Sequence, residues 1–193
     1  MKQRTREQWL NKVAELLKKT VFKRAGYDLG LIRYRIGCGL PNGVRAFGNR
    51  RTIGQCWTHS VSADKTHEIF ISPTVDDSLQ VAHTLAHELC HAVVGVDHGH
   101  DKVFRKCAKA IGLAGKMTAT EPTEVFAKFL KAKLKKLGAY PHQKMDVTKR
   151  KKQTTRMIKL ECPCCGYTVR ASGTWILIGL PKCPDGTEFE VKN

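Results

Sequence analysis

Hydrophobic residues recur at helical spacing in several stretches of the chain. Residues 6–24 have an apolar stripe beside a basic side and are predicted to form an amphipathic helix. A second helix follows "TVDD", whose side chains can cap it, and it is expected to stop at Gly95. Two more helices are predicted over residues 101–112 and 121–137, and Pro122 suits a first turn.

Shorter stretches alternate between apolar and polar residues, which is typical of half-buried strands. In "LIRYRIG" every second residue from Ile32 to Ile36 is apolar, and the glycine-rich "GCGLPNG" ends the strand. Further strands are predicted in "RTIGQCW" at 51–57 and in "HEIFISP" at 67–73. Helices and strands together fill residues 1–140, which we expect to form the main domain.

The periodic pattern then ends. Residues 141–156 are rich in turn formers and charge, and we predict a basic linker there. Residues 157–193 are too few to stabilise a core without help, so we expect a constraint such as a bound metal ion to hold them together.

The chain is strongly basic. Lys and Arg number 34 against 17 Asp and Glu, and the formal net charge of +17 indicates a polyanionic partner, with DNA as the first expectation. The linker contains an unbroken run of four cations, Lys149, Arg150, Lys151 and Lys152, and residues 121–137 contain several more lysines. These side chains are predicted to bind nucleic acid without sequence preference. A basic surface that only maintains solubility and an anionic membrane surface are the alternatives.

No stretch resembles a signal-peptide core, and the longest apolar run, "WILIGL" at 175–180, is far too short to cross a bilayer. We therefore expect a cytoplasmic protein without a membrane partner. In a reducing cytosol, the eight cysteines are expected to be thiols or metal ligands and not disulfides.

The strongest chemical signal is "HELCH" in the second predicted helix. His87 and His91 are one turn apart, so both imidazoles project from one face and can bind the same metal ion. Glu88 is turned about a quarter of the way round, where it can reach a metal-bound water but is poorly placed to bind the ion. Zinc peptidases use this arrangement, and their Glu takes a proton from the water that attacks a carbonyl. The sequence therefore predicts zinc as cofactor and Glu88 as catalytic residue.

A catalytic zinc site needs a third protein ligand, and several residues compete for that place. The metzincin spacing would use Asp97, although the glycine of that pattern comes one residue late. Thermolysin-like enzymes use a glutamate from a later helix, and Glu121 or Glu124 would serve here, although neither lies in that family's pattern. His98 and His100 both follow a glycine at which the chain can turn back toward the metal.

"HELCH" followed by "GHDKVFRKCAKAIGL" resembles the SprT-like (Spartan-type) metalloproteases of bacteria or phages, and the resemblance extends over most of the predicted main domain. It implies an α+β fold: a zincin-like metalloprotease domain with a small mixed sheet, helices and an HExxH active-site helix. Aligning Phe104 with the aromatic residue of the family's H-G-x-x-F/W segment makes His100 the third ligand. Asp101 stands where the family has glycine, which changes the turn, but an aspartate can still cap the next helix.

Neighbouring residues have simpler interpretations. His83 lies one turn before His87 on the same stripe. We expect it either to contact a metal ligand without binding the metal itself or to be exposed to solvent. Cys90 has apolar neighbours and is predicted to be a small buried residue. Met117 is predicted to belong to the core.

The C-terminal segment has its own cysteine cluster. Cys162 and Cys165 form a C-x-x-C turn, and Cys183 follows later, again beside proline and glycine. These residues are predicted to bind a structural zinc ion in a zinc-ribbon-like β unit, which SprT-like proteins often carry. The fourth ligand of such a ribbon is missing from its usual place, so Cys164 or Asp185 could replace it, or the site has been lost.

The resemblance implies a zinc-dependent protease whose substrates are proteins bound or crosslinked to DNA. We expect the substrate to lie as an extra strand beside "HEIFISP". One alternative is a non-catalytic nucleic-acid-binding zinc protein, against which Glu88 argues because a scaffold needs no general base. The other is a peptidase unrelated to DNA.

Overall fold

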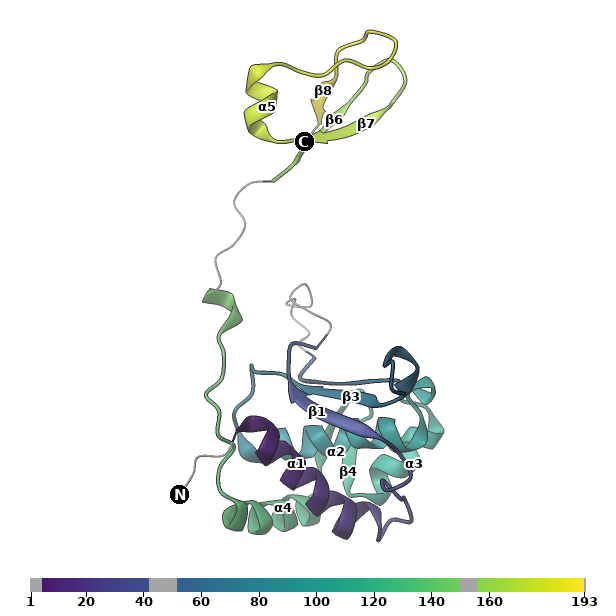
Figure 1. The fold of residues 1–193 in the computed structure, drawn as a ribbon, viewed down its shortest axis with the longest axis vertical. Helices are drawn as coiled ribbons and strands as arrows, with labels where there is room; N and C mark the ends of the chain where they lie inside the picture. The colour runs from purple at the N-terminus through teal and green to yellow at the C-terminus, as the bar shows by residue number, and fades with distance from the viewer. Residues whose placement is uncertain (1–4, 42–51, 150–155, 193) are drawn as a thin grey trace. The chain divides into compact units, whose positions relative to one another are not determined.

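A computed structural model describes residues 5–41, 52–149 and 156–192 (Figure 1). The chain forms two compact units, Met1–Val147 and Thr148–Asn193. The boundary between them falls within the segment that the sequence assigns to the linker.

The helices of the first unit begin and end at local signals in the sequence. The α-helices are α1 (Arg6–Leu17), α2 (Ser78–Val94), α3 (Lys102–Ala110) and α4 (Glu124–Leu137), and a π-helix, Lys18–Phe22, continues α1. At the start of α2 the Asp77 carboxylate accepts the Gln80 N–H, and at its end Gly95 has a φ of 101°. Such a backbone conformation favours glycine, so the predicted end of this helix is confirmed.

The start of α4 differs from the prediction. Ala119–Pro122 forms strand β5, which pairs with β4 (Leu113–Lys116) and does not join the helix. Thr123 then caps α4 by accepting the Phe126 N–H. The expectation that Pro122 belongs to the first helical turn is therefore wrong. Proline suits both a first helical turn and the edge of a sheet, so the sequence signal was ambiguous.

A small mixed sheet packs on α1 and α2. Its strands are β1 (Tyr34–Cys38), β2 (Gly54–Trp57) and β3 (His67–Ile71), in the order β1-β3-β2. β1 runs parallel to β3, and β2 runs antiparallel to it. Helices and small sheets thus form the expected α+β architecture. The expected place of a substrate strand is wrong, however, because "HEIFI" is the central strand and both of its edges are paired.

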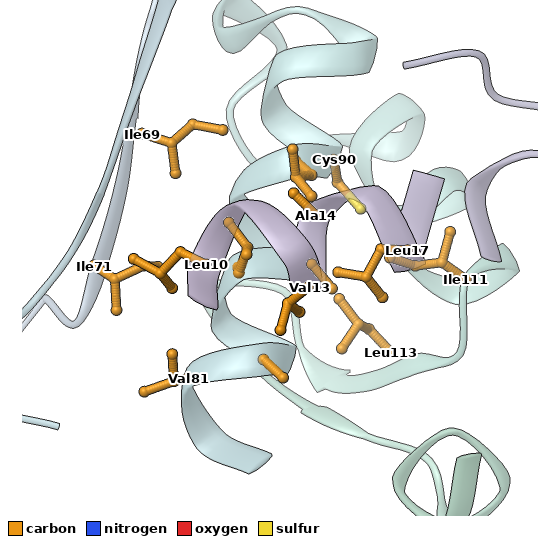
Figure 2. Packing of buried hydrophobic residues seen from close by; sticks show 14 of the residues in the cluster. Leu10, Val13, Ala14, Leu17, Ile69, Ile71, Val81, Cys90, Ile111 and Leu113 are labelled. Carbon is orange, nitrogen blue, oxygen red and sulfur yellow. The ribbon is translucent and has the colours of Figure 1, made fainter. Parts of the chain in front are cut away.

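The core of the first unit lies between this sheet and its helices (Figure 2). The buried residues of α1 are Trp9, Leu10, Val13, Ala14 and Leu17, and all except Ala14 belong to the apolar stripe read from the sequence. Ile69 and Ile71 project from β3 toward this stripe. Burial of each such aliphatic side chain contributes roughly 1.5–3 kcal/mol. Cys90 and Met117 are also buried, as predicted.

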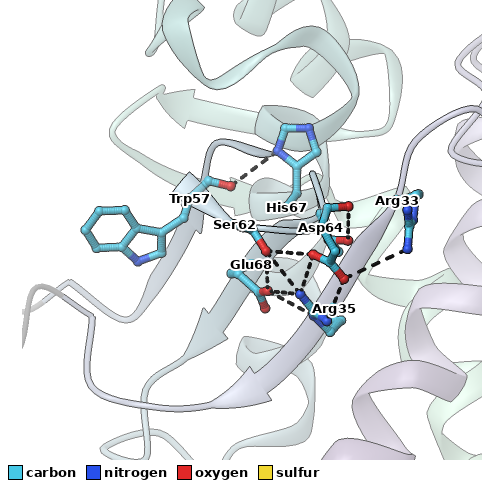
Figure 3. A network of polar contacts seen from close by, with 8 residues as sticks. Arg33, Arg35, Trp57, Ser62, Asp64, His67 and Glu68 are labelled. Atoms are coloured by element: carbon cyan, nitrogen blue, oxygen red, sulfur yellow. Dashed lines mark hydrogen bonds and ion pairs between the residues drawn. The ribbon is translucent and has the colours of Figure 1, made fainter. Parts of the chain in front are cut away.

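A polar network braces the connection between β2 and β3 (Figure 3). Arg35 of β1 donates to both carboxylate oxygens of Asp64, at 2.9 and 3.0 Å, and its Nε donates to Glu68 at 2.9 Å. Hydrogen bonds from Ser62, Thr66 and Arg35 lower the pKa of Asp64 to about 2. Because these groups are exposed, the network orders the connecting loop more than it stabilises the fold.

The first unit continues past α4 as an extended segment, residues 138–147. Trp9 Nε1 donates to the carbonyl of Gly138 at 2.9 Å, and the N–H of Met145 donates to the carbonyl of Pro73 at 2.7 Å. The beginning of the predicted linker is therefore fixed to the first unit.

The second unit is a small sheet with one short helix. Its elements are β6 (Ile158–Glu161), β7 (Thr168–Ala171), α5 (Gly173–Ile178) and β8 (Glu190–Lys192), with strand order β7-β6-β8. Leu160 and Phe189 are buried in its core, whereas α5 exposes Trp175 and Ile178. The helix was not expected, because its apolar run is too short for a helical period. Among the described helices of the chain, none is long and apolar enough to cross a membrane.

The sheet comes close to α2 at Gly54 of β2. A Cβ atom at this position would lie 2.5 Å from Oε1 of Glu88 and 2.7 Å from Cγ2 of Thr84. We expect Gly54→Ala to lower the free energy of unfolding by about 1–3 kcal/mol, because the added methyl group forces the strand and helix apart. Urea denaturation measures this loss.

The matched control is Gly37→Ala in β1. A Cβ atom there would meet only the Phe70 ring, at 3.8 Å, which is an ordinary contact. The control is expected to keep the stability of the unchanged protein. Equal stability of both variants would show that β2 can move away from α2 without cost.

Candidate active site

Helix α2 and the turn after it bring three histidines together. His87 and His91 lie one turn apart on α2, and the chain reverses at Gly95. His100 then comes back toward the helix, and its Nε2 lies 3.2 Å from Nε2 of His87. Nitrogen atoms of the three imidazoles all lie within 4.8 Å of one another. His98 is not part of this group.

The ring of Phe104, at the start of α3, packs against all three imidazoles. Its centroid lies 4.3 Å from that of His91 and 4.9 Å from those of His87 and His100. Phe104 is fully buried, so it forms a fixed apolar wall behind the imidazoles. The aromatic position that served to align the sequence thus has a direct packing role.

Asp101 stands where SprT-like proteins have glycine, and it caps α3. Its carboxylate accepts the N–H groups of Val103, at 2.7 Å, and Phe104, at 3.1 Å. Nδ1 of His98 lies 2.9 Å from the second carboxylate oxygen, and this contact lowers the pKa of Asp101. The predicted cap is confirmed, and His98 is engaged by Asp101 instead of the other histidines.

The three clustered imidazoles are neutral near pH 7. Burial and the neighbouring imidazoles lower the pKa of His87 to about 3 and that of His91 to about 4, and burial also lowers the pKa of His100. Thr120 Oγ1 of β5 lies 2.8 Å from Nδ1 of His87. When Nδ1 of His87 donates its proton to Thr120, Nε2 carries no proton, and its lone pair is directed at the cluster. The sequence offered no signal for Thr120, because the β4–β5 hairpin was not predicted.

This set of donors fits a zinc ion. Zinc binds imidazole nitrogens at about 2.0–2.1 Å, so two ligands of a tetrahedral site are roughly 3.3 Å apart. The 3.2 Å separation of the Nε2 atoms of His87 and His100 is close to that value. Catalytic zinc sites also use three protein ligands and leave the fourth position open. His87, His91 and His100 can therefore hold zinc.

Glu88 lies on the side of α2 that faces β2. Its side chain is only 5% exposed, and its carboxylate accepts the backbone N–H of Cys56. Burial raises the pKa of Glu88 to about 8. The metal-ligand group that the described residues form does not include it. A bound zinc ion would favour the carboxylate form and so lower this pKa, which leaves Glu88 able to accept a proton.

The other residues considered as a third ligand lie elsewhere. Oε2 of Glu121 is 3.6 Å from Nε2 of His83, and Glu124 forms an ion pair with Lys128 at 2.7 Å. Asp97 is exposed in the turn after α2. His83 itself is buried, so the expectation that it could be exposed is wrong.

The second unit contains a separate group of possible metal ligands. It consists of Cys162, Cys165, Cys183 and Asp185, whose ligand atoms lie within 4.8 Å of one another. The sulfur atoms of Cys165 and Cys183 are 3.3 Å apart. Cys164 lies outside this group, and a hydrogen bond from its thiol contributes most to lowering the pKa of Asp185 to about 2. Three thiols and a carboxylate are compatible with zinc.

The predicted nucleic-acid-binding run is described only at its first residue. Lys149 is exposed at the end of a single 3-10 turn, Val147–Lys149. Arg150, Lys151 and Lys152 lie outside the described residues. The role expected of this run therefore stays a prediction.

Known protein families include one that corresponds to this arrangement. A sequence model of the SprT-like family matches residues 32–125, from just before β1 to the start of α4. Neither a curated protein nor a solved structure matches the chain. The matched stretch holds α2, the clustered histidines and the capped start of α3, and it supports a metallopeptidase-type function at the level of the family. Residues 32–125 therefore match the SprT-like family, the resemblance that the histidine motif predicted.

Proposed function

We propose that the protein is a zinc-dependent metalloprotease that acts on proteins bound or crosslinked to DNA. The observation that carries the proposal is the combination of three neutral imidazoles within 4.8 Å and a buried carboxyl group on the same helix. A purely structural metal site would not require Glu88, because its carboxylate is not among the metal ligands. A hydrolytic site needs a proton acceptor there.

The residues of the chain have distinct roles in this proposal. His87, His91 and His100 would hold the metal, and zinc, when bound, supplies a Lewis acid that activates water. Glu88 accepts a proton from the attacking water at its carboxylate and passes it to the leaving nitrogen. The Cys56 N–H holds that carboxylate in place.

A peptide substrate is expected to pair with β2 and not with β3. Among the described strands, β2 pairs with β3 alone, and its Cys56 N–H is directed at Glu88. A peptide that extends a sheet gains main-chain hydrogen bonds independently of its side chains. In this place the substrate backbone would run beside Glu88.

Charge and an exposed surface favour DNA as the second partner. The formal net charge of +17 attracts a polyanion. In the second unit, Trp175, Ile178 and Arg170 line a shallow groove, and the Trp175 side chain is 67% exposed. Flat apolar rings and guanidinium groups stack on unpaired bases. The family resemblance links this partner to proteolysis.

Glu88→Gln should keep the metal but lose about 10²–10⁴-fold in the rate of hydrolysis, because it removes the proton acceptor and no ligand. The assay is cleavage of a DNA-binding protein with and without added DNA, and DNA should accelerate the unchanged enzyme. Glu124→Gln, an exposed site with the same chemical change, is the control and should retain activity.

The outcomes separate the alternatives. Cleavage by Glu88→Gln at the normal rate would exclude the proposed role of this residue. A rate that does not respond to DNA would leave a peptidase unrelated to DNA. DNA binding without cleavage by the unchanged protein would favour a non-catalytic nucleic-acid-binding protein.

Replacing His87, His91 or His100 by Ala should strongly reduce zinc bound at this site, whereas His98→Ala should not. The reason is geometric, since His98 contacts Asp101 and lies outside the cluster. Zinc content by elemental analysis measures the effect in a chain that also carries Cys162→Ser, so that the second unit adds no metal. Metal loss in His98→Ala with full retention in His100→Ala would reverse the assignment.

A second zinc equivalent is expected in the second unit. Asp185→Ala and Cys162→Ser should each remove it, because both residues belong to the four-ligand group. Cys164→Ser should weaken it less, since Cys164 acts only through its hydrogen bond to Asp185. If the unchanged protein holds a single equivalent that none of these substitutions alters, the group is not a zinc site.

A further inference from the structure

Helix α3 carries a continuous basic face. Four cations lie at positions i, i+3, i+4 and i+7 of a helix and are all exposed: Lys102, Arg105, Lys106 and Lys109. Residues at this spacing share one side of a helix. Phe104, Cys107 and Ala108 occupy the opposite side and are buried.

Nothing within the helix neutralises this face. Between Lys102 and Ala110 there is no acidic residue, and among the described residues none of the four cations forms an ion pair. The carboxylate of Asp101, which directly precedes the helix, is engaged by His98 and by backbone N–H groups of the first turn. On α4, by contrast, Lys128 pairs with Glu124, and Lys133 lies over the Phe129 ring.

The four cations destabilise the helix that carries them. Lys102 and Lys106, like Arg105 and Lys109, are like charges four residues apart, and such pairs destabilise a helix. Lys102 also stands in the first turn, where the helix dipole disfavours a cation. A surface that serves only solubility normally mixes both signs of charge. Helix stability therefore does not explain why the cations cluster on α3, whereas binding of an external anionic partner does.

The face belongs to the same helix that supports the histidine cluster from its other side. Lys102 follows His100 by two residues, and Phe104 of the same helix packs against His87 and His91. A polyanion bound along α3 would therefore be held beside the residues proposed to cleave peptides.

We propose that this face of α3 binds the phosphate backbone of DNA and so presents DNA-bound proteins to the histidine cluster. The proposal rests on the proposed protease function and adds a DNA-binding surface on the catalytic unit. From Lys102 to Lys109 the helix rises by about 10 Å. With a rise of about 3.4 Å per nucleotide along one strand, the face spans roughly three phosphates. Contacts of this kind are independent of base sequence.

The test compares two charge-matched variants of the full chain. In the first, Lys102, Arg105, Lys106 and Lys109 are replaced by Gln. In the second, four exposed cations of the first helical segment are replaced by Gln: Lys12, Lys19, Lys23 and Arg24. Both variants lose the same net charge. Circular dichroism and zinc content check that each keeps its fold and its metal.

Affinity for 20-nucleotide single-stranded and 20-base-pair double-stranded DNA is measured against salt concentration. The α3 variant should lose about three units of the slope of log affinity against log salt, because each phosphate contact contributes about 0.9. The control variant, with its four substitutions between Lys12 and Arg24, should lose less than about one unit. DNA-stimulated cleavage should fall in the α3 variant alone, and cleavage of an unfolded protein without DNA should stay unchanged in both.

Equal losses in the two variants would overturn the proposal, because only net charge would then matter. So would an unchanged slope in the α3 variant, which would leave the protease function and its DNA dependence intact. If the unchanged protein does not bind DNA, both the proposed role of the α3 face and the DNA part of the proposed function are wrong. Poly-glutamate that binds the unchanged protein as tightly as DNA of equal charge would point to an acidic polypeptide as the partner.

Discussion

The burial of one carboxyl group, that of Glu88, between α2 and β2 is the constraint on which the rest of the site depends. A buried carboxyl group is costly unless it is hydrogen-bonded, and the Cys56 N–H provides that bond. The strand can come this close because Gly54 has no Cβ atom. With Glu88 fixed toward the sheet, the rotation of α2 about its axis is set. His87 and His91 then face away from β2, toward the loop that follows the helix.

That loop performs several tasks within a few residues. Gly95 ends α2 in a conformation that favours glycine, and the reversed chain brings His100 to the imidazoles of α2. Asp101 caps α3 and engages His98, which removes a competing imidazole from the cluster. Phe104 then fills the space behind the rings. The two sides of α3 therefore differ completely, since one supports the histidines and the other presents cations to solvent.

The two possible metal sites are built by different means. In the first unit, helical periodicity aligns two ligands and a long-range fold contact orients one of them, through Thr120. In the second unit, two tight turns bring thiols together, with Gly166 and Gly186 donating to the carbonyls of Cys162 and Cys183. Neutral imidazoles leave the charge of a bound zinc ion uncompensated, which suits activation of water. Thiolates and a carboxylate neutralise it, which suits a structural role.

The sequence by itself determined those features that depend on short spacings. The pairing of His87 with His91, the end of α2 at Gly95 and the cap at Asp101 all arise within one or two turns of chain. Even His100 became the preferred ligand through local alignment with Phe104. Strand order, the hairpin that supplies Thr120 and the closeness of Gly54 to Glu88 were decided only by the tertiary structure. The reason is that a strand's pattern records which side is buried but not which strand lies beside it, so contacts between distant segments leave no local signal.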